Sequence, residues 1–100
     1  MQNHLSKTPA EIVEASAPIL GVTVEEIFSQ SRKRDISDVR RMIAGKLESL
    51  DQFSLSQIVR ALGRTDHTSA MHWRDTHKDY MQFNLDYREQ YNAYNQILEL

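Results

Sequence analysis

Three helix-start signatures confine this chain to a series of short helices. Each is a capping box, in which a hydroxyl residue stands three places before Glu or Gln, and the pairs are Thr8 with Glu11, Thr23 with Glu26, and Ser54 with Gln57. The two side chains of a capping box satisfy backbone amides that have no partner inside the helix. Gly21 and Gly63 stand where the first and third of these helices are expected to end, because glycine readily adopts the left-handed conformation that closes a helix.

Apolar spacing predicts a longer helix after the second box. Asp35 is expected to cap it, with Asp38 at its third position. Apolar residues then recur at steps of three and four, which gathers them on one helix face: Ile36, Val39, Ile43, Leu47 and Leu50. Arg40 and Arg41 fall away from that face, so we expect both to be exposed on the side of the preceding loop.

The last third of the chain predicts two more helices. One is expected to begin at Asp66 and to run to about Phe83. A further amphipathic stretch has Tyr87, Tyr91, Tyr94 and Leu98 at steps of four, three and four. Strand signals are nearly absent, so the predicted fold class is all-α, with about five to six helices that include a C-terminal helical extension.

Length and composition bound the domain organisation. The 100 residues can enclose one core, and no cysteine is present to form disulfides or thiolate-bound zinc. We expect a domain over residues 1–83 and an acidic, tyrosine-rich tail over residues 84–100. The longest apolar runs are a few residues, and the first residues lack a basic and an apolar export region, so we expect no membrane segment and a cytoplasmic protein. We expect no cofactor and no metal.

Positive charge is concentrated in the middle of the chain. The net charge is −2, but residues 30–75 carry nine Lys or Arg against six Asp or Glu, a local balance of +3. The densest cluster is Arg32, Lys33 and Arg34, which belongs to the segment of residues 29–34 that we call the basic loop. Local clusters of this kind govern affinity for polyanions more than the charge of the whole chain does.

The segment around Gly63 predicts a helix-turn-helix motif. A short capped helix, a glycine-bearing turn of about four residues and a longer helix follow one another there. In such motifs the second helix lies in the major groove of DNA, and its first residues contact base edges. The short polar side chains of Asp66, His67, Thr68 and Ser69 suit that role.

Other chemistry for these residues is less well supported. Asp66, His67 and Ser69 project in different directions from a helix start, so they cannot line up as a hydrolase triad. His67, His72 and His77 are five apart, which places neighbours roughly 140° apart around a helix and prevents them from sharing one metal ion. We therefore expect no enzyme, with Asp66 as a helix cap and His72 as a partly buried packing residue.

Two further clusters have both structural and functional interpretations. The triplet of Arg32, Lys33 and Arg34 could be a solvated surface loop. Basic arms beside helix-turn-helix motifs enter the minor groove of DNA, however, and we favour that interpretation here. For the tyrosine stripe we favour packing within the chain over base stacking, because its surroundings are acidic. A dimer contact through the tail is the alternative.

The middle of the chain resembles the C-terminal DNA-binding domain of the bacterial replication initiator DnaA. The resemblance covers roughly residues 10–80 and rests on the stretches SRKR, VRRMIAGKL, FSLSQIVRALG and DHTSAMH, the last being similar to the family signature D-H-T-T-V-L-H. It implies a Trp-repressor-like helical domain that binds double-stranded initiator boxes.

The resemblance also implies roles for individual residues. Arg32 would read the minor groove, with Lys33 and Arg34 beside it, while Asp66, His67 and Thr68 would contact bases in the major groove. Arg40 and Arg41 would lie on a DNA-facing helix. Backbone amides around Ser54, Leu55 and Ser56 would meet a phosphate, although the family often has proline where Ser56 stands.

Two features depart from the family pattern. The signature G-G-R-D-H-T reads GRTDHT here, which moves the arginine to Arg64 and puts Thr65 before the aspartate, and we expect both residues to contact DNA. Glu48 stands where the family commonly has a basic residue. The nucleotide-binding and oligomerising domains of an initiator are not part of the sequence. We therefore expect a small DNA-binding regulator at the nucleoid, with replication or transcription proteins as further partners. The alternative is an interaction module of DnaA-like fold that has lost DNA binding and binds protein through its tyrosines.

Overall fold

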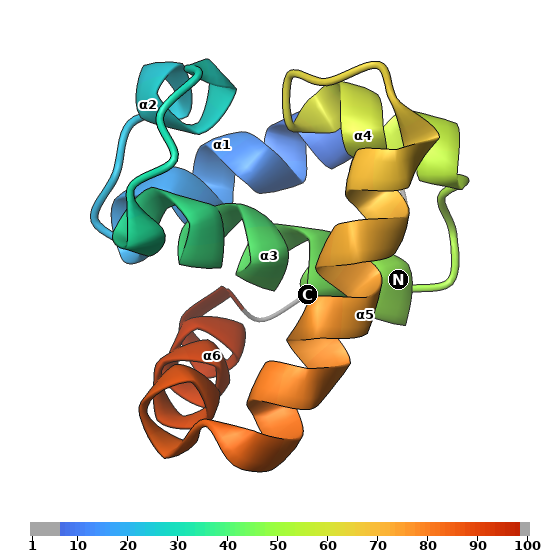
Figure 1. Ribbon diagram of the computed structural model, residues 1–100. Helices are drawn as coiled ribbons and strands as arrows, with labels where there is room; N and C mark the ends of the chain where they lie inside the picture. Colours follow the sequence, from blue (N-terminus) through green and yellow to red (C-terminus); the bar gives the residue numbers. More distant parts are fainter. Residues whose placement is uncertain (1–6, 99–100) are drawn as a thin grey trace, which may run out of the picture.

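Six helices make up the part of the chain that the structure describes. The computed structural model covers residues 7–98 and has no strand in that range. The helices are α1 (Pro9–Ile19), α2 (Val24–Phe28), α3 (Arg34–Ser49), α4 (Leu55–Ala61), α5 (His67–Phe83) and α6 (Leu85–Leu98), as drawn in Figure 1. The predicted all-α class is confirmed, as is the end of the fifth helix at Phe83.

The three capping boxes start the helices that they predict. Thr8, Thr23 and Ser54 each accept a hydrogen bond from the backbone amide of the Glu or Gln three residues later, and that side chain accepts one from the cap amide in return. Gly21 and Gly63 adopt φ angles of 77° and 80° just after α1 and α4. Local sequence therefore defines these helix ends.

The start of α3 differs from the prediction. The helix begins at Arg34, its N-cap is Lys33, and no side chain caps it. Asp35 lies inside the first turn, where its carboxylate accepts a hydrogen bond from the amide of Ile36 at 3.0 Å. A carboxylate at this place is still favourable, because the amino end of a helix carries partial positive charge.

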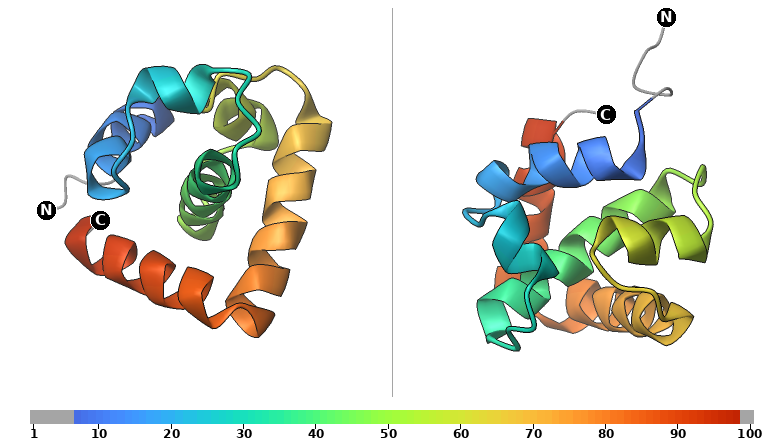
Figure 2. Two further views of the ribbon diagram at one scale, coloured as in Figure 1. Left: turned by 60° about the vertical axis from the view of Figure 1, so that its left-hand side comes forward. Right: turned by 90° about the horizontal axis from the view of Figure 1, so that it is seen from above.

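Helix α3 lies at the centre of the domain. It contacts each of the other five helices, and the left view of Figure 2 shows α5 and α6 meeting at a corner and enclosing it. Every residue of α3 from Val39 to Leu47 is buried. The prediction that Arg40 and Arg41 are exposed is therefore wrong, because an amphipathic pattern assumes one solvent-facing side, and α3 has none in this stretch.

Helix α6 completes the core with its tyrosines. Tyr87, Tyr91 and Tyr94 are all buried, and the hydroxyl of Tyr94 lies 2.7 Å from Ser16 Oγ on α1. The predicted packing of the tyrosine stripe within the chain is confirmed. The core continues across the predicted boundary at residue 83, and these side chains are turned away from any partner protein. A homodimer through the tail stays a prediction.

The crossing of α3 and α5 is unusually close at Gly45. A Cβ atom built at this glycine would lie 2.6 Å from the ring of His77. The His77 ring also packs edge-on against Tyr87 and Tyr91, and its Nδ1 lies 2.7 Å from the Tyr87 hydroxyl. The packing histidine of α5 is thus His77, whereas His72 is exposed, which corrects the expectation for His72.

No helix among residues 7–98 combines the length and the apolar character that crossing a membrane requires.

Candidate nucleic-acid interface

Helices α4 and α5 form the predicted helix-turn-helix. Helix α4 ends at Ala61, the chain turns at Gly63, and Asp66 caps α5 by accepting a hydrogen bond from the amide of Thr68 at 2.9 Å. The predicted capping role of Asp66 is confirmed. One oxygen of its carboxylate makes this bond and fixes the side chain at the amino end of the helix.

The first residues of α5 face solvent. Thr65, Asp66, His67 and Thr68 are all exposed, and Ser69 is half-buried. Nε2 of the His67 imidazole lies 2.6 Å from Ser56 Oγ on α4, so the ring is held at the surface and is not covered by neighbouring side chains. These groups supply donors and acceptors of the kind that read base edges.

The basic loop presents its cations outward. Arg32, Lys33 and Arg34 are exposed. The backbone between them and α2 is shaped by serine side chains, since Ser29 Oγ accepts from the amide of Ser31 and Ser31 Oγ accepts from the amide of Lys33, each at 3.2 Å. The loop therefore has local order while its charged side chains stay free of ion pairs among residues 7–98.

Arg40 anchors the basic loop from beneath. Its guanidinium donates to four backbone carbonyls at 2.7 to 3.1 Å, those of Glu26, Ile27, Ser29 and Ser31. Burial and, to a smaller extent, the nearby charge of Arg64 lower the pKa of Arg40 from its ordinary value. The side chain is 4% exposed, so the expected place of Arg40 on a DNA-facing surface is wrong.

Arg41 joins α3 to α5. It donates from Nε to Thr76 Oγ1 at 2.7 Å, forms an ion pair with Asp38 at 2.6 Å, and stacks over the Tyr80 ring at 4.4 Å from the ring centre. The residue is 7% exposed. The prediction that Arg41 lies on an exposed helix face is also wrong, because these contacts hold its guanidinium inside the domain.

Arg64 binds the basic loop from the helix-turn-helix side. One of its terminal nitrogens donates to the carbonyl of Ser29 at 2.9 Å, and the other lies 3.3 Å from the carbonyl of Phe28. The side chain was expected to contact DNA, but the structure directs its guanidinium to the loop. Sequence reasoning missed this contact, because no local pattern links residues 35 positions apart.

Gly63 brings the same two segments into direct contact. A Cβ atom at this glycine would lie 2.9 Å from the Phe28 ring and 3.2 Å from the Phe28 Cα. The turn before α5 and the end of α2 therefore touch. Figures 1 and 2 agree in showing the loop after α2 beside the turn that leads into α5. The structure thus brings together the two features that the sequence predicted as a combined DNA-binding surface.

The amino end of α4 lies next to His67. Its capping box satisfies the amides of Ser54 and Gln57. The first amides of a helix have no intrahelical acceptor, and those of Leu55 and Ser56 have no protein acceptor within residues 7–98.

Glu48 is paired with a basic residue. Its carboxylate lies 4.0 Å from Nε of Arg74, which also lies 3.3 Å from Asp75. Glu48 is half-buried beside α5. Its negative charge is thus partly balanced within the protein.

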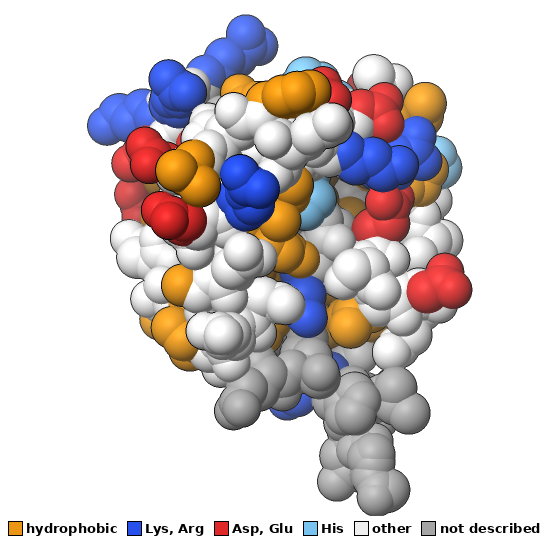
Figure 3. All heavy atoms as spheres, turned by 90° about the horizontal axis from the view of Figure 1, so that it is seen from below, with side chains coloured by type: hydrophobic (Ala, Val, Ile, Leu, Met, Phe, Trp, Pro, Cys, Tyr) orange, Lys and Arg blue, Asp and Glu red, His pale blue; other side chains and the backbone are white. Residues whose placement is uncertain are grey.

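The charges form a mixed surface. Figure 3 shows Lys and Arg side chains projecting from one corner of the face that is seen from below, with acidic side chains nearby. Of the nine basic residues between positions 30 and 75, Arg40, Arg41 and Lys46 are buried. The local excess of positive charge available to a ligand therefore comes from the basic loop and from scattered exposed side chains.

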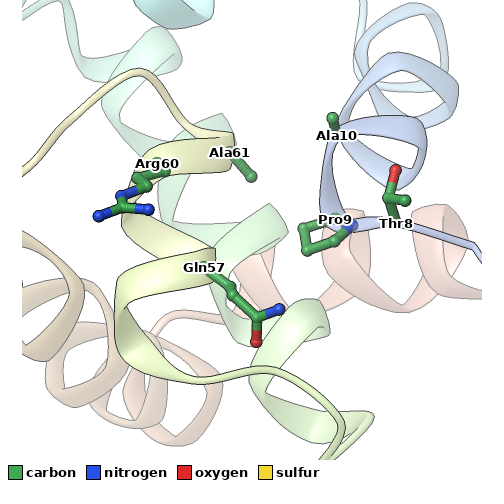
Figure 4. Close-up of a pocket in the computed structure, with 6 residues that line it drawn as sticks. All are labelled: Thr8, Pro9, Ala10, Gln57, Arg60 and Ala61. Carbon is green, nitrogen blue, oxygen red and sulfur yellow. The ribbon is translucent and has the colours of Figure 1, made fainter.

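A surface pocket lies apart from these features, between α1 and α4. It has a volume of about 290 Å³ and is lined by Thr8, Pro9, Ala10, Gln57, Arg60 and Ala61. Figure 4 shows Pro9 facing α4, whereas the Arg60 guanidinium on α4 is directed away from Pro9. The lining offers no carboxylate or imidazole for acid–base chemistry. Within residues 7–98, no three His, Asp or Glu side chains come together as a metal site.

Comparison with known proteins agrees with this geometry. The family described as "Bacterial dnaA protein helix-turn-helix" matches residues 9–76. A chromosomal replication initiator protein DnaA from Gloeobacter violaceus is 37% identical over 65 residues, which are 65% of this chain and 15% of that protein. The DnaA of Clavibacter sepedonicus is 26% identical over 92 residues, 92% of this chain and 18% of that protein.

The chain thus spans less than a fifth of the length of these relatives. No solved structure matches it. The family match covers α1 to α4 and residues 67–76 of α5, so it includes the basic loop, the turn of the helix-turn-helix and the first part of its second helix. The chain belongs to the bacterial DnaA helix-turn-helix family.

Proposed function

We propose that this chain is a sequence-specific regulator that binds double-stranded DNA at sites related to DnaA boxes. Membership of the family suggests DNA binding in general. The observation that carries the specific proposal is the carbonyl of Ser29, which accepts hydrogen bonds from both Arg40 and Arg64 and so fastens the basic loop to the helix-turn-helix. Two exposed reading elements are thereby held at a fixed relative position.

In this proposal the two elements enter neighbouring grooves. The amino end of α5 lies in the major groove, where Thr65, Asp66, His67 and Thr68 meet base edges. Arg32 enters the adjacent minor groove, where closely spaced phosphates strengthen the negative potential that attracts an arginine. A fixed loop favours this mode, because a preorganised contact loses less conformational entropy on binding.

Electrostatic affinity is assigned to the exposed cations alone. Arg32, Lys33 and Arg34 supply it, whereas Arg40 and Arg41, which were expected on a DNA-facing helix, are buried and support the fold from inside. The amides of Leu55 and Ser56, after the Ser54 cap, are proposed to meet a phosphate. We place this activity at bacterial DNA in the cytoplasm, where replication or transcription proteins would be further partners.

The direct test is fluorescence anisotropy with labelled duplexes. We expect binding to a duplex that carries a DnaA-box-like site, with log affinity falling against log salt at a slope of roughly −0.9 for each phosphate neutralised. A shuffled duplex of equal length should bind more weakly. Selection of bound duplexes from a random pool then defines the site.

The absence of salt-sensitive binding at low ionic strength would overturn the proposal. That result would favour the interaction module, although its partner could not use Tyr87, Tyr91 or Tyr94, which are buried.

A further inference from the structure

The side chain of Ser56 holds one nitrogen of the His67 ring. Ser56 Oγ and His67 Nε2 are 2.6 Å apart, and the bond joins the two helices of the helix-turn-helix. Ser56 is the second residue of α4 and is half-buried, whereas His67 is the first residue of α5 and is exposed. The more rigid partner therefore lies on the inner helix.

This bond determines which ring nitrogen can meet a ligand. An imidazole carries its two nitrogens on different edges of the ring, and a half-turn about the Cβ–Cγ bond exchanges Nδ1 with Cδ2 and Nε2 with Cε1. Nε2 is occupied by Ser56, and Nδ1 has no partner among residues 7–98. A ring flip would break the Ser56 bond, so the bond favours the orientation that leaves Nδ1 free.

We propose that Ser56 is a positioning residue that makes His67 address a base edge through Nδ1 alone. The inference rests on the proposed function, because it needs His67 to lie in the major groove. A ring that can offer either nitrogen from two positions can bond to several base edges. A ring held in one orientation discriminates between them, since a groove hydrogen bond specifies a base only when its donor or acceptor has a fixed place.

Base preference is the readout that separates this role from a merely structural one. In Ser56→Ala, the preference for the best over the worst base at the position read by His67 should fall about three- to tenfold, the size of one hydrogen bond's net contribution. Affinity for random duplex is measured beside it, so that a loss of preference is distinguished from a uniform loss of phosphate contacts. Ser56→Thr keeps a hydroxyl and should restore the preference. Ser49→Ala is the matched control, because it removes a hydroxyl that bonds to the Lys46 carbonyl at the far end of α3, outside the helix-turn-helix.

A double-mutant cycle identifies the base position that His67 reads and tests whether Ser56 acts through His67. His67→Ala defines the position at which preference is lost. Ser56→Ala should then have little further effect in the His67→Ala background, because the two changes remove the same interaction. Equal and additive losses at different positions would overturn the inference, as would an unchanged base preference in Ser56→Ala.

Nuclear magnetic resonance of the DNA-free protein keeps this inference separate from the proposed function. The ring nitrogen shifts of His67 should show Nε2 in a hydrogen bond in the native chain, and that signature should disappear in Ser56→Ala. If the native chain binds no duplex, the proposed function fails, and with it the base-reading role, while the ring signature still reports the bond. If duplex binding is normal and Nε2 shows no hydrogen bond, only the inference fails.

Discussion

Arg40 and Arg64 donate hydrogen bonds to the same carbonyl oxygen, that of Ser29, at 2.8 and 2.9 Å. Arg40 reaches it from the central helix α3, and Arg64 reaches it from the turn before α5. Two positive groups near one oxygen repel each other, and the charge of Arg64 contributes to the lowered pKa of Arg40. The arrangement persists because backbone carbonyl oxygens concentrate partial negative charge around both guanidinium groups.

Removing Arg64 should uncouple the basic loop from the helix-turn-helix. In Arg64→Ala we expect affinity for the preferred duplex to fall by about tenfold, comparable to one or two hydrogen bonds from a charged group. Affinity for random duplex should fall less, because the exposed cations remain. Anisotropy with both duplexes measures the ratio. A proportional loss on both would mean that Arg64 acts on phosphate and not on the loop.

Removing Arg40 should affect the free energy of unfolding first. Arg40→Ala leaves four carbonyls near the loop without this donor and opens a gap in the core, so we expect a loss of about 3 kcal/mol or more. Urea denaturation followed by circular dichroism measures it. Arg34→Ala, which removes an exposed side chain of the same length, should cost below about 0.5 kcal/mol.

Arg32 should carry discrimination without carrying stability. In Arg32→Ala we expect a loss of about 1–3 kcal/mol in the preference for specific over random duplex, with an unchanged denaturation midpoint. Arg88→Ala serves as the control, because Arg88 is an exposed arginine on α6, outside the proposed interface. Should Arg32→Ala weaken both duplexes equally, the side chain binds phosphate only.

Gly63 and Gly21 form a matched pair for the contact with Phe28. Both have positive φ, but a Cβ atom meets the Phe28 ring at Gly63 and nothing within 4 Å at Gly21. Gly21→Ala should cost about 1 kcal/mol through the backbone alone. Gly63→Ala should cost at least about 1 kcal/mol more, because Phe28 must move. Thermal denaturation of both variants gives the difference, and equal costs would show that Phe28 yields freely.

His77 should make the stability of the domain depend on pH. Burial, with a smaller effect of the Arg41 charge, lowers the pKa of His77 to about 4. In the unfolded chain its pKa is about 6.5, so the unfolded state binds more protons between these values. The contribution of the neutral His77 to the free energy of unfolding is therefore fully present above about pH 6.5, and it is lost as the pH is lowered towards 4. Allowing for solvent screening, we expect a loss of about 2 kcal/mol.

Urea denaturation at a series of pH values between 4 and 7 measures this dependence. His77→Gln should flatten the profile in that range, whereas His72→Gln, which changes an exposed histidine of the same helix, should leave it as it is. A profile of the same slope in His77→Gln would assign the titration to another group.

The sequence predicted the ends of helices well, but it predicted poorly which charged and histidine side chains are buried. Some features depend only on residues a few positions apart, so short stretches of sequence predict them: the capping boxes, the glycine turns and the Asp66 cap. The burial of Arg40 and Arg41 depends on five helices surrounding α3, which no helical period reveals. The wrong expectation for His72 has a similar origin, because the approach of α5 to Gly45 decides that His77 is the histidine that packs inside.

The interface was predictable as a pair of elements but not as a connected unit. Exposed side chains of the basic loop and of the α5 amino end follow from their positions in loops and helix starts. The bonds of Arg64 to Ser29 and of Ser56 to His67 join segments that are distant or separated by a turn. Such contacts depend on how the helices pack, and the pattern of one sequence does not specify them.

The carbonyl of Ser29 has one more consequence. Arg40 and Arg64 donate hydrogen bonds to main-chain oxygens, and every amino acid provides a main-chain oxygen. The side chains at positions 32 and 33 can therefore be substituted while the hydrogen bonds that hold the loop backbone remain. Proteins that bind different duplexes could be made from this scaffold by changing those two side chains alone.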